Sequence, residues 1–139
     1  MPLFAYSDIR GDSVYRPIVD VIIVNGKAEF PCLAIVDTGA DVCAFPMLFA
    51  SELGLDPLGQ TPLPVVGAGV GGACDAFYFE VILRVELLGE FRVRAAFVET
   101  LNTVGFGLLG HGGFLDQVQA TFATHKRVFS VTRNEDIKT

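Results

Sequence analysis

The sequence predicts an all-β domain, built as a closed barrel or a sandwich with one or two short helices. Three observations support this. Short runs rich in β-branched and aromatic residues follow one another and are separated by glycine-containing turns. Asn25-Gly26 is a strong hairpin signal between two such runs. Only two short segments have the composition of a helix, so the strands must build the core.

The first half of the chain supplies a hairpin, a short strand and a helix. Proline at position 46 suits the first turn of a helix, and Gly54 suits its end. The expected strands are residues 15–24, 28–36 and 42–45, and the expected helix is residues 46–53.

The second half continues the strand pattern. A strand at residues 61–66 enters the glycine-rich loop 67–72, which is typical of a mobile hairpin tip. A hairpin follows at 76–88 and 91–98, turned at Gly89-Glu90. Leu108-Leu109-Gly110 reads as a buried strand. The remaining elements are a short helix at 113–118 and strands at 118–123 and 127–132, turned at 124–126.

Size and composition restrict the class of protein. The chain has 139 residues, of which 51% are hydrophobic and 19% are charged, so it fits one domain spanning residues 1–139 and is not intrinsically disordered. The net charge of −6 opposes binding to phosphate backbones, and no nucleic-acid partner is expected. No apolar run reaches membrane-spanning length, so no membrane partner is expected.

Cysteine usage and the amino terminus favour a cytoplasmic protein. The three cysteines, Cys32, Cys43 and Cys74, are odd in number and lack CxxC spacing. We expect reduced thiols, and neither a metal site nor a cofactor. The amino terminus shows no basic stretch followed by an apolar segment, as a secretory signal would.

One carboxylate stands out as a candidate for chemistry. Asp37 follows five consecutive apolar residues, 32–36, and precedes Thr38-Gly39. A carboxylate at the end of a buried strand is a candidate catalytic group, because desolvation adjusts its proton affinity. The alternative is an ordinary Asx turn that closes a hairpin. The three residues alone leave both interpretations open.

The glycine-rich loop has a competing interpretation of its own. Gly67, Gly69 and Gly72 formally satisfy GxGxxG, a dinucleotide-binding pattern. That pattern requires a βαβ unit, and no helix follows the loop here. A hairpin tip therefore fits better than a cofactor site.

Taken together and in this order, the motifs resemble those of the retropepsin-like aspartic proteases. Residues 34–41, AIVDTGAD, resemble the family's signature, and residues 69–72 resemble the tip of its flap. Gly107-Leu108-Leu109-Gly110 resembles the strand under the active-site loop, and residues 113–116 the short C-terminal helix. The resemblance covers residues 15–133 and implies a single-lobe, closed β-barrel with a glycine-rich flap hairpin.

The resemblance also implies roles for individual residues. Asp37 would be the catalytic carboxylate, Thr38 would bond across a dimer axis, and Gly39 would let the substrate backbone approach. Substrate would be bound by Ile35, Ala40, Asp41, Gly69, Val70, Gly71, Phe106 and Leu108.

One residue departs from the family's pattern. Where the family has an arginine that pairs with the second aspartate of the signature, this chain has His111. We expect His111 to brace Asp41 in the same way, with a shorter and titratable side chain.

These roles imply an aspartic endopeptidase. Its mechanism needs two carboxylates that share one proton across a water, and this chain has one Asp-Thr-Gly. The enzyme would therefore be a homodimer acting on an extended peptide or protein substrate. Residues 1–9 could supply a dimerising strand.

Two other functions remain open. One keeps the fold without the chemistry, as a catalytically weak or inactive dimeric module that binds peptides or serves as a scaffold. The other, a lipocalin-like carrier, would not explain the Asp37-Thr38-Gly39 turn.

Overall fold

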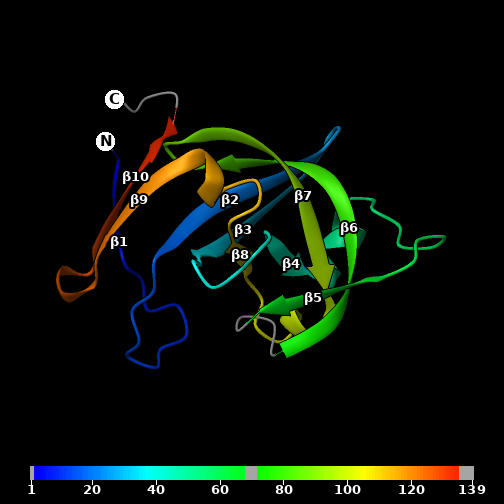
Figure 1. Cartoon of the computed structure of the whole chain (residues 1–139), viewed down its shortest axis with the longest axis horizontal. Coiled ribbons are helices and arrows are strands. Elements are labelled where there is room, and N and C mark those ends of the chain that lie inside the picture. Colours follow the sequence, from blue (N-terminus) through cyan, green and yellow to red (C-terminus); the bar gives the residue numbers. More distant parts are fainter. Residues whose placement is uncertain (1, 68–71, 135–139) are drawn as a thin grey trace.

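The protein forms a β-barrel with a smaller sheet attached at one end (Figure 1). This computed structural model describes residues 2–67 and 72–134, with side chains for 2–64 and 74–134. The strands within these ranges are β1 (Leu3–Ala5), β2 (Ile18–Asn25), β3 (Ala28–Val36), β4 (Ala44–Pro46), β5 (Leu63–Gly67), β6 (Gly72–Val85), β7 (Gly89–Val98), β8 (Gly107–Leu109), β9 (Val118–Ala123) and β10 (Val128–Arg133). The helices are α1 (Met47–Glu52) and the 3₁₀ turns η2 (Glu99–Leu101), η3 (Leu115–Gln117) and η4 (Thr124–Lys126).

The barrel closes because β2, at one end of the strand order, pairs with β6 as well as with β3. The described part of the large sheet has the order β2-β3-β8-β4-β7-β6-β5. Strand β2 also pairs with β6, from Val21↔Val85 to Val24↔Ile82, so the first six strands form a ring. Closure removes free strand edges from the barrel. The predicted all-β closed barrel is confirmed.

The small sheet has the order β1-β10-β9 and carries the beginning and the end of the described chain. Part of the 1–9 segment, Leu3–Ala5, pairs with β10 of the same chain. Phe4 stacks on Phe129, with ring centroids 5.1 Å apart, and both side chains are buried. These aromatic side chains bury the inner face of the small sheet against the barrel.

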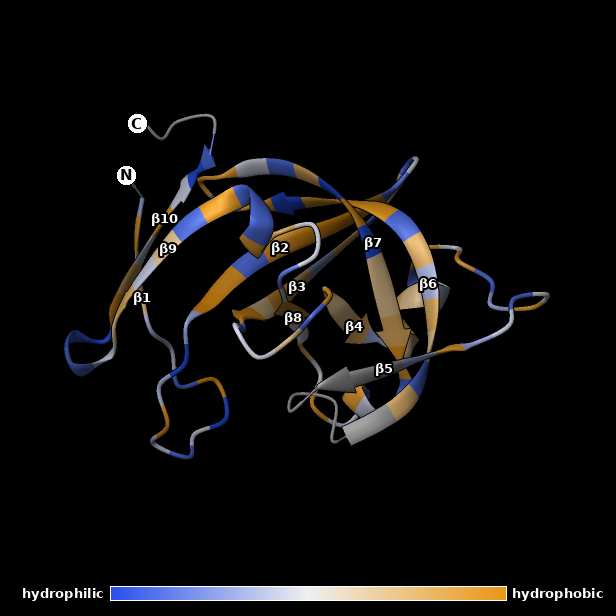
Figure 2. Ribbon diagram, in the orientation of Figure 1, coloured by the Kyte–Doolittle hydropathy of each residue, from blue (hydrophilic) through white to orange (hydrophobic). Residues whose placement is uncertain are grey.

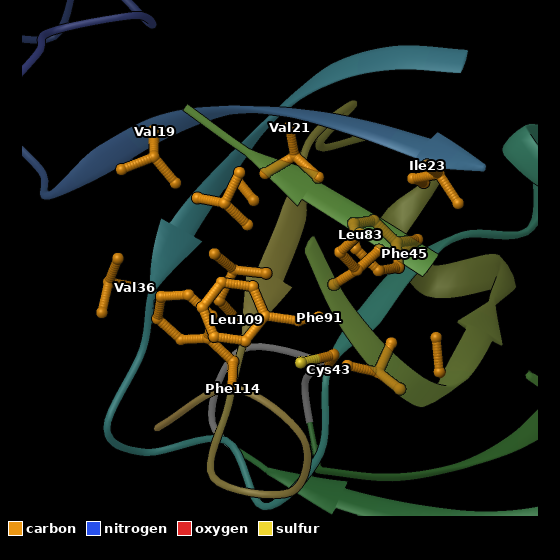
Figure 3. Close-up of a cluster of buried hydrophobic side chains, with 14 of the residues drawn as sticks. Val19, Val21, Ile23, Val36, Cys43, Phe45, Leu83, Phe91, Leu109 and Phe114 are labelled. Atoms are coloured by element: carbon orange, nitrogen blue, oxygen red, sulfur yellow. The ribbon is translucent and has the colours of Figure 1, made fainter. Parts of the chain in front are cut away.

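The barrel is filled with large apolar side chains. The hydropathy colouring in Figure 2 shows apolar residues along most of β2 and at the end of β7, and both strands lie in the barrel wall. Val36 of β3, Leu109 of β8 and Phe91 of β7 meet Phe114 in the core, as Figure 3 shows. Phe91 and Phe114 have ring centroids 5.0 Å apart. Phe114 thereby attaches the segment after β8 to the barrel.

A second apolar cluster consists mostly of small side chains. Its buried members are Ala40, Ala44, Ala76, Ala96, Val98, Leu101 and Leu108. Strand β3 contributes to both clusters, because successive side chains of a strand point to opposite faces. Ala34 and Val36 belong to the barrel core, whereas Ile35 packs against the second cluster.

Two details differ from the prediction. The β6–β7 turn occupies residues 86–88 and not Gly89-Glu90. Leu87 and Gly89 have positive φ (63° and 91°), so the chain reverses before the predicted Gly89-Glu90. Leu88 lies within the turn but is buried like a strand residue. The expected helix at 113–118 is reduced to η3, which is one 3₁₀ turn.

The hairpin that contains the predicted flap is described in its two arms. Strands β5 and β6 pair from Leu63↔Ala76 to Gly67↔Gly72. At the end of helix α1, the Leu53 carbonyl accepts a hydrogen bond from Asn25 Nδ2 (2.8 Å). None of the helices in the described ranges is both long and apolar enough to cross a membrane.

Candidate active site

The turn that begins at Asp37 lies where three strands come together. Strand β3 leads into the turn and β4 leads out of it, but the two do not pair with each other. Strand β8 lies between them, parallel to β3 (Ile35↔Leu108) and antiparallel to β4 (Ala44↔Leu108). The Asp37 N–H donates to the Leu109 carbonyl (2.9 Å), so the pairing with β8 continues into the turn.

Within the turn, the Asp37 carboxylate is held by the main chain. The Gly39 N–H donates to Asp37 Oδ1 at 2.8 Å, and the Ala40 N–H donates to the Asp37 carbonyl at 3.2 Å. A Cβ on Gly39 would lie 3.2 Å from Oδ1, so a larger residue would crowd the carboxylate. The Asx hydrogen bond considered from the sequence is therefore present. It does not close a hairpin, because β8 separates the two strands.

Gly110 lets the chain after β8 pass directly beneath this turn. A Cβ on Gly110 would collide with the carbonyl oxygens of Ala40 and Val42. Just beyond it, the His111 N–H donates to the Ala40 carbonyl (2.9 Å) and the Gly112 N–H to the Asp41 carbonyl (2.8 Å). The Asp37 turn is thus fixed mainly by main-chain hydrogen bonds from the segment that follows β8.

The expected ion pair between His111 and Asp41 is wrong for this structure. Among the described residues no ion pair involves Asp41. The His111 ring instead places Nε2 2.7 Å from the Thr38 carbonyl oxygen. Imidazole reaches less far than guanidinium, and a carbonyl of the turn lies within its reach. The histidine still ties the segment after β8 to the turn, through a different partner.

Cys43 anchors the other side of the turn. Its side chain is fully buried, and its Sγ lies 3.7 Å from the Gly112 carbonyl. Burial raises the pKa of the Cys43 thiol to about 12, so the group stays protonated and can act as a weak donor. The sequence predicted this cysteine only as one of three reduced thiols.

The structure brings most of the predicted site residues to one region. Asp37 is half-buried, Thr38, Gly39 and Asp41 are exposed, and Ala40 is buried. Ile35, Ala40 and Leu108 share the second apolar cluster. Phe106 is buried ahead of β8 but belongs to neither cluster. The predicted Gly69, Val70 and Gly71 lie outside the described residues.

The chemistry available in one chain is that of a single, oriented carboxylate. Oδ1 is occupied by Gly39, and in the described ranges Oδ2 has no protein partner. Among the described residues, no three His, Cys, Asp or Glu side chains are grouped to hold a metal ion. Sequence reasoning missed the Leu109 carbonyl and the Cys43 thiol as supports, because main-chain partners across a fold leave no mark on residue identity.

Comparison with known proteins agrees with this geometry. A sequence model of the family described as aspartyl protease matches residues 19–111. The crystal structure of a retropepsin-like aspartic protease from Rickettsia conorii is similar in fold, with a TM-score of 0.60 and 15% sequence identity. That alignment covers 95% of this chain and 99% of the other. A comparison with curated proteins finds no match.

Proposed function

Because the chain belongs to the aspartyl protease family, we propose that it is an aspartic endopeptidase that works as a homodimer. The observation that carries the proposal is the Asp37 turn, a carboxylate oriented by a main-chain donor over a strand crossing. The sequence contains one Asp-Thr-Gly. Hydrolysis by an aspartate pair requires two carboxylates, so the second must come from a second copy.

In the proposed mechanism, two Asp37 carboxylates face one water across a twofold axis and share one proton, since like charges about 3 Å apart do not both ionise. The ionised carboxylate takes a proton from the water while the water oxygen attacks the peptide carbonyl carbon. The protonated carboxyl donates to the carbonyl oxygen, which gives a tetrahedral diol. The carboxyl that took the water's proton then gives it to the leaving nitrogen, while the other carboxylate takes a proton from a diol hydroxyl. The C–N bond breaks to give an amine and a carboxylic acid, and the pair again holds one proton.

The contacts within one chain support these roles. Gly39 occupies Oδ1 of Asp37, which leaves Oδ2 for water. Thr38 is exposed on the outside of the turn, where its hydroxyl is available to a second copy. We assign the β5–β6 hairpin to closure over an extended peptide, whose main chain it would hydrogen-bond.

The substrate we propose is an extended peptide with apolar side chains beside the cleaved bond. Ile35, Ala40 and Leu108 surround the turn with apolar side chains.

We further propose that residues 1–139 form one domain and that the protein works in the cytoplasm. The free state of Cys32, Cys43 and Cys74 supports a reducing compartment.

Subunit mixing tests the proposal. Wild-type protein is combined with the Asp37→Asn variant, and cleavage of fluorogenic peptides is measured after the subunits exchange. If both carboxylates are needed, mixed dimers are inactive, so at equal amounts activity falls to about a quarter of that expected for the total protein. Activity that falls only by simple dilution, from protein that sediments as a monomer, would contradict it.

A second function fits one specific observation. The Gly39–Asp37 hydrogen bond gives Asp37 a structural role as an Asx turn, which a module that binds peptides without cutting them would also need. Such a module would bind the same peptides without releasing fragments, and Asp37→Asn would leave its peptide affinity unchanged. Fragment analysis by mass spectrometry separates the two functions.

A further inference from the structure

The hydrogen bond of His111 ends on a peptide group with a special position. Its Nε2 lies 2.7 Å from the Thr38 carbonyl oxygen. That carbonyl belongs to the peptide group that joins Thr38 to Gly39. The N–H of the same group donates to Asp37 Oδ1 at 2.8 Å. One planar unit therefore separates the imidazole from the carboxylate of Asp37.

The planarity of this unit couples its two ends. In a trans peptide the C=O and the N–H are coplanar and point in opposite directions. A donor that fixes the carbonyl therefore also fixes the direction of the N–H. A hydrogen bond accepted by the carbonyl further polarises the amide and strengthens its N–H as a donor. Both effects act on Asp37.

The main chain places the imidazole for this task. The His111 N–H donates to the Ala40 carbonyl (2.9 Å), and the His111 carbonyl accepts from the Asp116 N–H (3.0 Å). A carbonyl oxygen can only accept, so Nε2 must carry the proton. Both main-chain groups of His111 thus make hydrogen bonds within the chain, which hold the residue so that its ring reaches the Thr38 carbonyl.

We propose that His111 is a positioning residue, which orients the Asp37 carboxylate through the Thr38–Gly39 peptide group. This deepens the proposed function and rests on it. His111 does not touch substrate or water in this role. It sets the plane of the donor that occupies Oδ1, and so the direction in which Oδ2 is presented to the attacking water.

The test compares three variants. His111→Phe keeps a flat ring and removes the donor. In His111→Gln the amide nitrogen lies as many bonds from Cα as Nε2 does, so the donor is kept without the ring. His125→Phe, in the exposed turn η4, is the matched control because it alters the other histidine of the chain. Sedimentation checks the assembly of each variant.

Two measurements are made on each protein. The first is kcat and KM on a set of fluorogenic peptides with apolar residues around the cleaved bond. The second is the NMR shift of the Gly39 amide proton, which reports its hydrogen bond to Asp37 without requiring activity. In wild-type protein, ¹⁵N shifts of the neutral His111 ring identify the nitrogen that carries the proton.

We expect His111→Phe to lower kcat by about 10- to 100-fold with KM changed less than about threefold, the pattern of a misaligned catalytic group. The Gly39 amide proton should move upfield. His111→Gln should recover most of kcat and the wild-type Gly39 shift, and His125→Phe should match wild type. The neutral ring should carry its proton on Nε2.

Three results would overturn the proposal. They are an unchanged Gly39 shift in a folded His111→Phe protein, equal losses of kcat in the Phe and Gln variants, or a neutral ring protonated on Nδ1. If the wild-type protein cleaves no peptide, the proposed function fails, whereas the Gly39 shift and the ring tautomer still decide the positioning role. If His111→Phe does not fold, the tautomer and the Gly39 shift of His111→Gln decide it.

Discussion

The candidate active site and the β6–β7 turn each hold a carboxylate near other polar groups, and they do so in different ways. At the candidate active site, Asp37 is oriented by the main chain of its own turn, and no hydrogen bond among the described residues joins it to a second carboxylate. At the second region, Asp20 of β2 and Glu86 of the β6–β7 turn are already neighbours. The Glu86 N–H donates to the Asp20 carbonyl (3.1 Å), which brings the two residues together.

The environment of the second pair favours the neutral form of Glu86. It borders a cavity of about 280 Å³ that is lined on one side by Phe4, Ala5 and Ile9. Burial, followed by the hydrogen bond to Asp20, raises the pKa of Glu86 to about 7. Within a single chain, Glu86 is thus a carboxyl group that binds its proton more tightly than usual.

The comparison separates two properties of a carboxyl group, a raised pKa at Glu86 and a fixed main-chain support at Asp37. At Asp37 the Gly39 donor is accompanied by the strand crossing under Gly110 and by the apolar cluster that contains Ile35 and Leu108. What marks Asp37 is this fixed main-chain support. Under the proposed function, the second carboxylate comes from a second copy.

The largest contrast is expected in turnover. Asp37→Asn should lower peptide cleavage by at least about 10²- to 10⁴-fold while the fold is kept, because it removes the group that exchanges protons with water. Glu86→Gln should leave turnover at the wild-type value. Initial rates on the same fluorogenic peptides, together with circular dichroism, check both. Comparable turnover by Asp37→Asn would exclude the proposed mechanism.

The second contrast concerns the backbone crossing. Gly110→Ala should lower the free energy of unfolding by about 3 kcal/mol or more, since its Cβ would meet the carbonyl oxygens of Ala40 and Val42, which cannot move as side chains do. Gly112→Ala is the matched control, because its Cβ would lie 3.3 Å from the Asp41 oxygen and needs only a small adjustment. Urea midpoints compare them. Equal midpoints would mean that the turn yields at this crossing.

The pH dependence of cleavage sharpens the comparison further. A pair of Asp37 carboxylates works while it holds one proton, so cleavage should be fastest on the acid side of neutrality. We expect the rate to fall by about tenfold or more between pH 5 and pH 9. The same profile measured on Glu86→Gln should coincide with that of the wild type. A rate that climbs steadily over this range would indicate a different nucleophile.

The smallest effect is expected at the second pair. The folded state raises the pKa of Glu86 and so binds the proton more tightly than the unfolded chain. The resulting stability is present at low pH and is lost as pH rises through about 7. Glu86→Gln should therefore raise the urea midpoint at about pH 8.5 and change it little at about pH 5.5. Solvent screening limits the gain to about 1 kcal/mol.

A matched control separates this effect from a general loss of negative charge. Glu52→Gln, at the end of α1, removes one carboxylate from an exposed position away from Asp20. It should change the urea midpoint equally at both pH values. If the urea midpoint of Glu86→Gln changed with pH as that of the wild type does, the raised pKa of Glu86 would be excluded.

Much of the fold could be predicted because its signals are local. The apolar run before Asp37 predicts a buried strand, and Asn25-Gly26 a hairpin; both are present as β3 and the β2–β3 connection. The 3₁₀ turn at 115–117 and the reversal at 86–88 were harder, since Leu88 is apolar like a strand residue but packs at the end of a turn. Local composition does not record which way the chain turns.

The strands, the alternatives of barrel and sandwich, and the position of the Asp37 turn could be predicted from the residues, because apolar alternation and glycine are properties of neighbouring residues. The ordered motifs, through the family they resemble, added the closed barrel. What holds the Asp37 turn became visible in the folded chain alone. The Leu109 carbonyl, the Gly110 crossing and the choice of the Thr38 carbonyl over Asp41 by His111 depend on segments about 70 residues apart in the chain. Main-chain donors and acceptors are the same in every residue, so their pairing is set by the path of the chain and not by its letters.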